Sequence, residues 1–189
     1  TIKTDFFREP SHFNFLVETA LPNLINDYGV GIDRPLRLWS AGCSTGEEPY
    51  TLAMVLSEFA ERVPGFDFSI FATDISTKVL ELARQGIFHT DKVAPVPLSL
   101  QKKYLLRSKD TERKQVRIVP ELRSKVSFRR VNFMDDDYAI RESFDIIFCR
   151  NVIIYFDRPT QEVFLGKLCS HLRSGRYIFM GHSETLNGM

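Results

Sequence analysis

The sequence has little that points to a metal site, a disulfide framework or a nucleic acid. Its three cysteines, Cys43, Cys149 and Cys169, show no C-x-x-C spacing. A structural zinc is therefore not expected, and the thiols are predicted to be reduced and partly buried. The four histidines are scattered without ligand spacing. A net charge of +1 over 189 residues lacks the markedly basic character that is typical of nucleic-acid binding.

Long apolar runs are also missing. No stretch approaches the roughly 18 apolar residues of a membrane span, and no signal-peptide pattern is present. We therefore expect a cytoplasmic protein without membrane insertion. The hydrophobic content of 43% and the charged content of 26% are those of an ordinary globular chain, and the length suits one domain with a substantial core.

The segment Leu36–Tyr50, LRLWSAGCSTGEEPY, is the most informative part of the chain. An apolar run, a small-residue loop around Gly42 and the start of a helix form the entry to a nucleotide-type pocket at the carboxyl end of a parallel sheet. The helix opens with Glu47 and Glu48, which would repel a phosphate, and the loop lacks the G-x-G-x-x-G spacing. S-adenosylmethionine (SAM) has a ribose, an ammonium and a sulfonium but no phosphate. The residues therefore favour a SAM pocket and methyl transfer.

Apolar runs that alternate with helical patterns predict an α/β fold, a mostly parallel sheet with helices on both faces. Strands are expected at 36–40, 68–73, 126–131, 144–149 and 177–180. Helices are expected over 11–28 with a bend or break at Pro22, from Pro49 onward, from Ser76 to Gly86, and from Asp157 to Ser174–Gly175. Residues 87–125 fit the alternation less well and predict a small insertion, with a short helix at 98–107 and a strand at 116–119.

Polar residues follow the predicted strands, where ligands bind in such sheets. Asp74 ends the second strand and can accept hydrogen bonds from ribose hydroxyls; its alternative role is to cap the next helix. Asn132 offers donor and acceptor edges to an adenine rim, and its alternative is a turn residue. Phe133 and Ile75 are apolar neighbours for the adenine. Arg150–Asn151 and His182 follow the fourth and fifth strands.

Together these motifs resemble the chemotaxis receptor methyltransferases of the CheR family. The matching segments run in the family's order over essentially the whole chain: TDFFRE at 4–9, TGEEPYTLA at 45–53, FATDIS at 71–76, VNF at 131–133, IIFCRNVIIYFD at 146–157 and MGHSE at 180–184. The resemblance implies a Rossmann-like class I methyltransferase fold. It also implies an enzyme that uses SAM to methylate glutamate side chains on the cytoplasmic helical bundle of chemoreceptors.

Carried over residue by residue, the resemblance implies a SAM site and two residues nearest to the reacting carboxylate, Arg8 and Tyr155. The SAM site is expected to consist of Thr4, Arg8, Gly42, Glu48 or its neighbour Glu47, Asp74, Asn132, Phe133, Arg150 and Asn151. Structural alternatives stay open at this point: an ion pair of Arg8 with Glu47 or Glu48, and simple packing of the Tyr155 ring.

Residues 1–189 are expected to be one SAM-dependent methyltransferase domain, with 87–125 as the inserted small subdomain. The resemblance implies that the family's N-terminal helical domain and the last edge strands of the sheet lie outside this sequence. In some members the subdomain docks a receptor tail peptide by adding a strand, whereas the loop Ser108–Gln115 here is glycine-free and heavily charged. Ile2 stands where members often have Asn, and Ser174–Arg176 where they often have a Pro-Gly-Gly-like turn.

Three other interpretations remain open from the residues alone. The first is a SAM-dependent methyltransferase of a small molecule or RNA, although the near-neutral charge disfavours RNA. The second is a SAM-binding signalling module without turnover, against which the joint presence of Arg8, Asp74, Asn151 and Tyr155 argues. The weakest is an NAD-dependent dehydrogenase, because the phosphate-binding loop is wrong.

Overall fold

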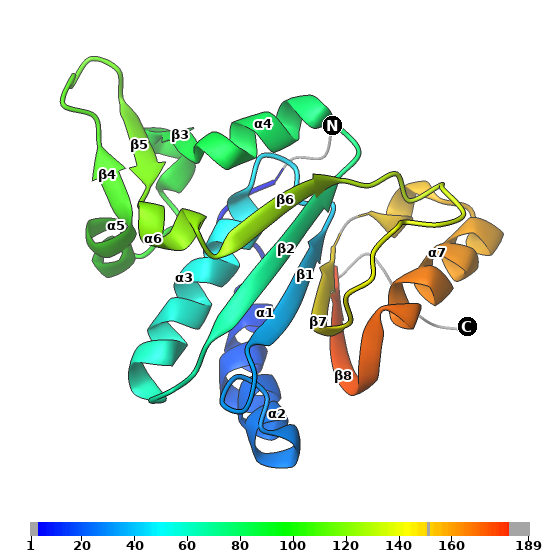
Figure 1. Cartoon of the computed structure of the whole chain (residues 1–189). Coiled ribbons are helices and arrows are strands. Elements are labelled where there is room, and N and C mark those ends of the chain that lie inside the picture. Colours follow the sequence, from blue (N-terminus) through cyan, green and yellow to red (C-terminus); the bar gives the residue numbers. More distant parts are fainter. Residues whose placement is uncertain (1–3, 151, 182–189) are drawn as a thin grey trace.

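A five-stranded sheet forms the centre of the molecule, with strand order β6-β2-β1-β7-β8. The computed structural model describes residues 4–150 and 152–181 (Figure 1). All four strand pairings are parallel, so the expected parallel sheet is confirmed. The chain builds outward from β1 on one side and then returns to its other side, so the strand order reverses between β1 and β7. The strands are β1 (Leu36–Ala41), β2 (Phe68–Asp74), β6 (Val126–Arg130), β7 (Phe144–Cys149) and β8 (Leu172–Met180).

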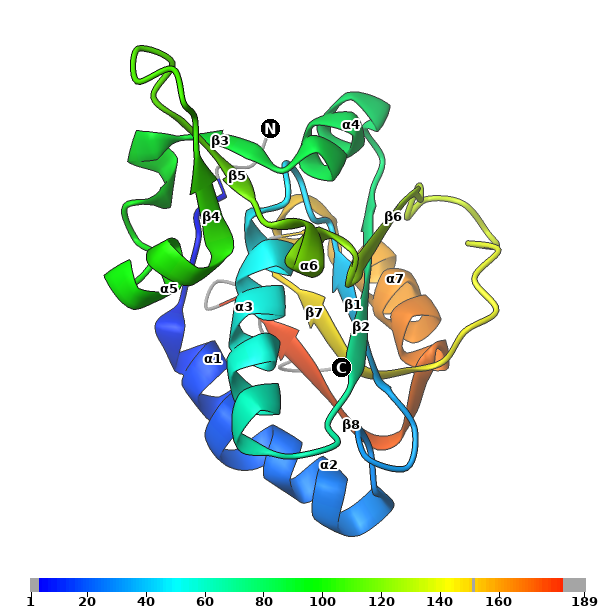
Figure 2. The same cartoon turned by 60° about the vertical axis from the view of Figure 1, so that its left-hand side comes forward.

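Helices cover both faces of this sheet. Helices α1 (Pro10–Phe15), α2 (Leu21–Tyr28) and α3 (Glu47–Arg62) lie on one face, and α7 (Arg158–Ser170) lies on the other (Figure 2). In β7, Ile146 and Phe148 belong to the core on the α3 side, whereas Ile147 and Cys149 belong to the core on the α7 side. This alternation follows from the two-residue period of a strand. Every residue of β7 is buried, as expected for a central parallel strand.

The helix expected over 11–28 is divided. A π-helical turn at Leu16–Ala20 separates α1 from α2, and Pro22 lies in the first turn of α2. Proline has no N–H to donate and its ring crowds the carbonyl four residues earlier, so the helix cannot continue regularly through this position. The prediction that Pro22 bends or divides the helix is confirmed.

Two predicted helix starts have the expected caps. The Ser76 hydroxyl accepts a hydrogen bond from the Val79 N–H at 3.3 Å and opens α4 (Thr77–Gln85). The Asp157 carboxylate accepts one from the Thr160 N–H at 2.9 Å and opens α7. Such caps satisfy N–H groups that have no partner inside the helix.

The predicted end of the last helix at Ser174–Gly175 is wrong. The helix ends at Ser170, and β8 already begins at Leu172. The ladder between β7 and β8 is irregular there, because Phe144 pairs with Leu172 but Ile146 pairs with Tyr177. Gly175 has φ of 74° within this irregularity. Ser174–Gly175 therefore lies in a strand bulge and does not end a helix. Glycine is common at both kinds of position.

The insertion forms a small antiparallel sheet with strand order β3-β5-β4, beside the large sheet in Figure 1. Its elements are β3 (Ile87–His89), the 3₁₀ turn η2 (Thr90–Val93), α5 (Leu98–Tyr104), β4 (Leu105–Arg107), β5 (Gln115–Ile118) and α6 (Pro120–Arg123). The helix expected over 98–107 thus ends at Tyr104 and continues as a strand. Glu58 of α3 anchors the insertion, with its carboxylate 2.8 Å from the Lys103 ammonium and 2.5 Å from the Tyr104 hydroxyl.

None of the helices within 4–150 and 152–181 is both long enough and apolar enough to span a bilayer.

A buried carboxylate ties the amino ends of the central strands together. Asp145 of β7 is fully buried and accepts hydrogen bonds from the Arg34 guanidinium at 2.9 and 2.5 Å and from the Arg37 N–H at 3.0 Å. Arg176 of β8 lies 3.4 Å away. Burial raises the pKa of Asp145, but the bonds from Arg34 and Arg37 and the charge of Arg34 outweigh burial and hold that pKa below its usual value.

We expect Asp145→Asn to lower the free energy of unfolding by about 3 kcal/mol near neutral pH, because the arginines lose their buried counter-charge. A carboxylate with a lowered folded-state pKa stabilises above its unfolded pKa of about 3.9 and loses this effect as the pH falls through the folded value. The difference between variant and wild type should therefore shrink in acid. Urea denaturation followed by circular dichroism, once near neutral pH and once in acid, measures this difference in unfolding free energy. The exposed Asp110, 3.5 Å from Arg113, provides the control Asp110→Asn, and equal losses for the two variants would contradict the prediction.

Candidate functional site

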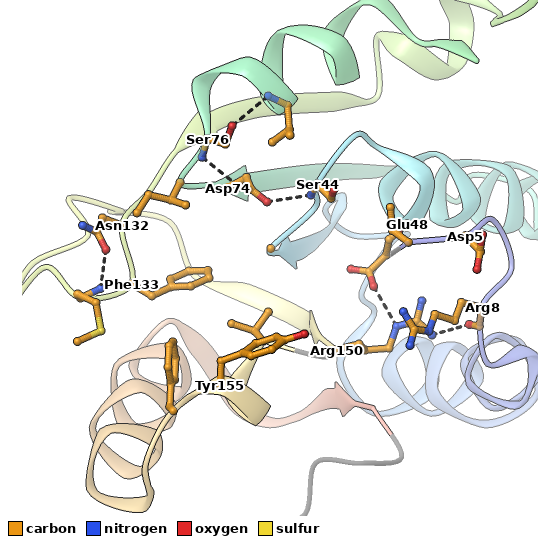
Figure 3. Close-up of a pocket in the computed structure, with 17 residues that line it drawn as sticks. Asp5, Arg8, Ser44, Glu48, Asp74, Ser76, Asn132, Phe133, Arg150 and Tyr155 are labelled. Atoms are coloured by element: carbon orange, nitrogen blue, oxygen red, sulfur yellow. Dashed lines mark hydrogen bonds and ion pairs between the residues drawn. The ribbon is translucent and has the colours of Figure 1, made fainter. Parts of the chain in front are cut away.

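A cavity of about 460 Å³ opens at the carboxyl ends of β1, β2 and β7, where the strand order reverses (Figure 3). In parallel α/β sheets this is the position where ligands bind, and the volume is within the usual range for small-molecule sites. Of the residues predicted from the sequence, the cavity walls contain Thr4, Arg8, Gly42, Glu48, Asp74, Asn132, Phe133, Arg150 and Tyr155. The predicted Asn151 lies outside the described residues, as do Ile2 and His182.

The loop after β1 is fixed against the end of β2. The N–H groups of Gly42 and Cys43 donate to the Thr73 carbonyl at 2.9 and 2.8 Å. Gly42 has φ of 78°, and a Cβ there would lie 2.7 Å from a methyl carbon of Val152. Only glycine therefore fits at this floor of the cavity, where the loops after β1 and β7 meet. Burial, reinforced by the carboxylates of Asp74 and Glu48, raises the pKa of the Cys43 thiol, which keeps it neutral and unreactive.

Asp74 faces the cavity and also holds the two loops beside it. One carboxylate oxygen accepts from the Ser44 N–H at 2.9 Å and the other from the Ser76 N–H at 3.0 Å. The alternative that Asp74 caps α4 is wrong in detail, because Ser76 is the cap. A carboxylate has about four acceptor positions in all, so each oxygen of Asp74 keeps one for a ligand.

Glu48 and Arg150 form an ion pair in the wall. The Arg150 Nε donates to Glu48 Oε2 at 2.9 Å, and Glu48 Oε1 accepts from the Ser40 hydroxyl at 2.7 Å. Arg150 also donates to the Arg8 carbonyl at 2.6 Å. Glu48 therefore has Arg150 as its partner, an ion pair that the sequence did not reveal.

Of the two acidic residues that open α3, only Glu48 is among the described lining residues. Glu47 is 1% exposed and accepts a short hydrogen bond from the Thr45 hydroxyl. Its other carboxylate oxygen lies 3.4 Å from the Lys92 ammonium of the insertion. The acidic pair is thus divided between the cavity and the interface with the small subdomain.

Asn132 and Phe133 form the opposite wall. Asn132 Oδ1 accepts a hydrogen bond from the Met134 N–H at 2.9 Å, so Asn132 stabilises the turn after the strand. Asn132 also lines the cavity. The Phe133 ring lies 4.8 Å from the ring of Phe164 in α7. This packing fixes an apolar surface beside Asp74.

Tyr155 stands at the mouth of the cavity. It ends the 3₁₀ turn η3 (Ile153–Tyr155), and its hydroxyl points toward the cavity interior in Figure 3. The residue is 66% exposed, so core packing does not explain its position. Sequence reasoning missed several further lining residues, although most are neighbours of predicted ones within the same motifs: Asp5, Ser44, Val79, Met134, Val152 and Phe156.

The strand order and the cavity at its reversal are those of a Rossmann-like α/β fold, which class I methyltransferases share with dinucleotide-binding proteins. Two solved structures are similar in fold. A DszA carbon methyltransferase has a TM-score of 0.53 at 17% identity, covering 92% of this chain and 36% of that one. The glycopeptide N-methyltransferase MtfA, complexed with sinefungin, has a TM-score of 0.52 at 13% identity, covering 94% and 50%.

The chain belongs to the CheR family. The family described as "CheR methyltransferase, SAM binding domain" matches residues 2–189. A chemotaxis protein methyltransferase of Borreliella burgdorferi is 44% identical over 100% of this chain and 66% of its own length. Chemotaxis protein methyltransferase 2 of Pseudomonas aeruginosa is 43% identical, and the match covers 96% of this chain and 62% of that protein. The Escherichia coli chemotaxis protein methyltransferase is 38% identical, and the match covers 97% of this chain and 61% of that protein. The chain thus spans less than two thirds of the length of these relatives.

The family match confirms the expected resemblance and SAM as the cofactor. The walls of the cavity also suit SAM chemically. The remaining acceptor positions of Asp74 suit ribose hydroxyls, and Phe133 and Ile75 offer apolar surface for an adenine.

We expect Asp74→Ala to weaken binding of S-adenosylhomocysteine at least about tenfold, because hydrogen bonds to a charged group are lost. Titration calorimetry measures the affinity, with NAD as the ligand that should not bind. Asp67 precedes the amino end of the same strand and is paired with Lys125 at 2.8 Å, so Asp67→Ala is the matched control. Unchanged affinity in Asp74→Ala, or a similar loss in Asp67→Ala, would remove Asp74 from the binding site.

Proposed function

We propose that this protein transfers the methyl group of SAM to glutamate side-chain carboxylates of chemoreceptor cytoplasmic domains, forming glutamate methyl esters in chemotactic adaptation. The observation that carries the proposal is that Arg8 and Tyr155 share one cavity with Asp74 and Glu48, in a chain of the CheR family. This cavity combines a place for the cofactor with a cation and a hydroxyl that can hold a carboxylate.

The proposed chemistry needs no general base. A glutamate carboxylate with an ordinary pKa of about 4.3 is already anionic near neutral pH. SAM supplies the methyl group: a carboxylate oxygen bonds to the methyl carbon while the carbon–sulfur bond breaks and its electron pair stays on sulfur. The protein then has to align the acceptor and remove its water. No histidine is found among the described residues that line the cavity, which suits this mechanism.

Arg8 and Tyr155 are assigned the acceptor. The Arg8 guanidinium can hold one carboxylate oxygen while the other attacks, and the Tyr155 hydroxyl can orient it by donating a hydrogen bond. Too strong a grip by Arg8 would also stabilise the reactant and slow transfer. For the cofactor we propose Thr4, Arg8, Gly42, Glu48, Asp74, Asn132, Phe133, Arg150 and Asn151.

The proposed partner is the cytoplasmic helical bundle of a chemoreceptor, which places the protein in the cytoplasm. We further propose that a receptor tail peptide docks on the inserted subdomain by adding a strand. Strands β3 and β4 are the two edges of the small sheet, and Ile87 and Leu106 on them are 42% and 50% exposed. An edge strand with apolar side chains is suited to pairing with an extended peptide.

Methylation of a receptor cytoplasmic fragment by the protein at its full natural length tests the proposal. With methyl-labelled SAM, we expect label on the receptor that base releases as methanol, as glutamate methyl esters do. Replacing the acceptor glutamates by alanine should abolish the label. Base-stable label, or label only on a small molecule or RNA, would instead support a methyltransferase of another class.

We expect Arg8→Ala to lower the methylation rate at least about hundredfold, the usual cost of losing one preorganised donor to a reacting oxygen. Single-turnover kinetics with saturating SAM measures this rate. Arg113→Ala is the control, since Arg113 is an exposed arginine in the loop of the small subdomain, 3.5 Å from Asp110. Near-normal turnover of Arg8→Ala would remove Arg8 from the mechanism.

The rate should also be nearly independent of pH above about pH 6, because the attacking carboxylate is already ionised. Below that value the rate should fall with the protonation of the acceptor glutamate. Initial rates across the pH range, with binding checked at each pH, test this expectation. A rate that instead rises with pH through an apparent pKa near 7 would show that a general base takes part.

A further inference from the structure

Residues 4–9, here called the N-terminal strap, form one side of the cavity. Thr4, Asp5 and Arg8 of the strap line it. Arg8 stands between two residues in the left-handed backbone region, Phe7 with φ of 55° and Glu9 with φ of 54°. Such a conformation costs a non-glycine residue about 1–2 kcal/mol, and it persists only where surrounding contacts impose it. The position of Arg8 therefore depends on what holds the strap.

Contacts from the main domain hold the carboxyl-terminal half of the strap. The Phe7 N–H donates to the Thr51 hydroxyl of α3 at 3.2 Å, and the Arg8 carbonyl accepts from Arg150 at 2.6 Å. These contacts fix the backbone on either side of the bond between Phe7 and Arg8.

The inserted subdomain holds the amino-terminal half. In Figure 2 the strap, in dark blue, runs from α1 alongside the subdomain. The Phe6 ring lies edge-on against Phe88 of β3, with centroids 4.9 Å apart. Lys92 of η2 adds polar contacts: its ammonium donates to the Thr4 carbonyl and lies 3.4 Å from the Asp5 carboxylate.

The same ammonium reaches the main domain. It lies 3.4 Å from the carboxylate of Glu47 in the first turn of α3. A lysine ammonium has three donors, and Lys92 thus meets three oxygens, two on the strap and one on Glu47 of α3. Glu48, next to Glu47, lines the cavity.

We propose that Lys92 is a positioning residue that holds the N-terminal strap against α3 and so sets Arg8, Asp5 and Thr4 at the cavity. This inference rests on the proposed function for its kinetic part. Lys92 is not itself among the described lining residues, so it acts through the strap and not by touching the ligand.

A role in global stability alone would look different. The Lys92 side chain is 32% exposed, but the Glu47 side chain that it meets is 1% exposed, so Lys92→Met also costs stability by leaving a buried carboxylate without its cation. A role in stability alone would lower the melting temperature and leave the ligand affinity and kcat of the folded protein unchanged.

The test compares Lys92→Met with Lys125→Met in the protein at its full natural length. Lys125 is a control of similar exposure, because its side chain is 37% exposed and paired with Asp67 at 2.8 Å. This pair lies at the amino end of β2, away from the cavity at the carboxyl end. We expect Lys92→Met to lower both the affinity for S-adenosylhomocysteine and kcat by about tenfold, since small misplacements of a positioning group are costly. Lys92→Arg, which keeps the charge and the donors, should restore most of both losses. Lys125→Met should change neither.

Affinity and kcat within about twofold of wild type in Lys92→Met would overturn the inference, as would a failure of Lys92→Arg to restore them. If Lys92→Met does not fold, Lys92→Gln, which keeps one amide donor, takes its place with the same expected direction. Calorimetry with S-adenosylhomocysteine needs no methyl acceptor. A wild-type protein that binds this ligand but methylates no receptor glutamate would therefore refute the proposed function, while the binding comparison still decides the role of Lys92.

Discussion

The buried guanidinium of Arg150 is the interaction on which the arrangement of the site depends. It stands at the carboxyl end of β7 and joins Glu48 of α3 to the carbonyl of Arg8, and it lies over the rings of Phe13 and Phe148. A buried ion pair is tolerated only where further hydrogen bonds satisfy both ions. Here the Ser40 hydroxyl completes the set around Glu48. The ion pair thus links the central strands, a helix and the strap at one point, and the cavity walls follow from it.

This arrangement explains why a helix can open with two carboxylates. Negative charge is favourable near a helix amino end, but both side chains are largely buried and each needs a partner. Glu48 receives an arginine from β7, and Glu47 receives a lysine from the insertion. Glu48 thereby forms part of the cavity wall, and Glu47 binds the inserted subdomain. The two adjacent acidic residues thus have different roles, which their positions in the sequence alone do not reveal.

Much of the fold could be predicted from local pattern. Strand 144–149 is apolar except for Asp145, and Ser76 and Asp157 are caps whose hydrogen bonds reach only three residues along the chain. The errors occurred where a long-range contact decides: Ser174–Gly175 is compatible with a helix stop and a bulge, and pairing with β7 selects the bulge. The motifs also identified most lining residues. The partners of Glu47 and Glu48 could not be predicted, because Lys92 and Arg150 are 45 and 102 residues away from them.

The wide separation of the cavity walls along the chain has a consequence for how the site comes into being during synthesis. The cavity residues that follow β1 and β2 are synthesised early. Arg150 and Val152, which complete the cavity floor next to Gly42, are synthesised about a hundred residues after Gly42. Contacts this distant form late because a long loop must close first. A nascent chain that ends before β7 therefore lacks Arg150 and Val152 from the cavity walls, and we expect full ligand affinity to be reached only when β7 has paired with β1.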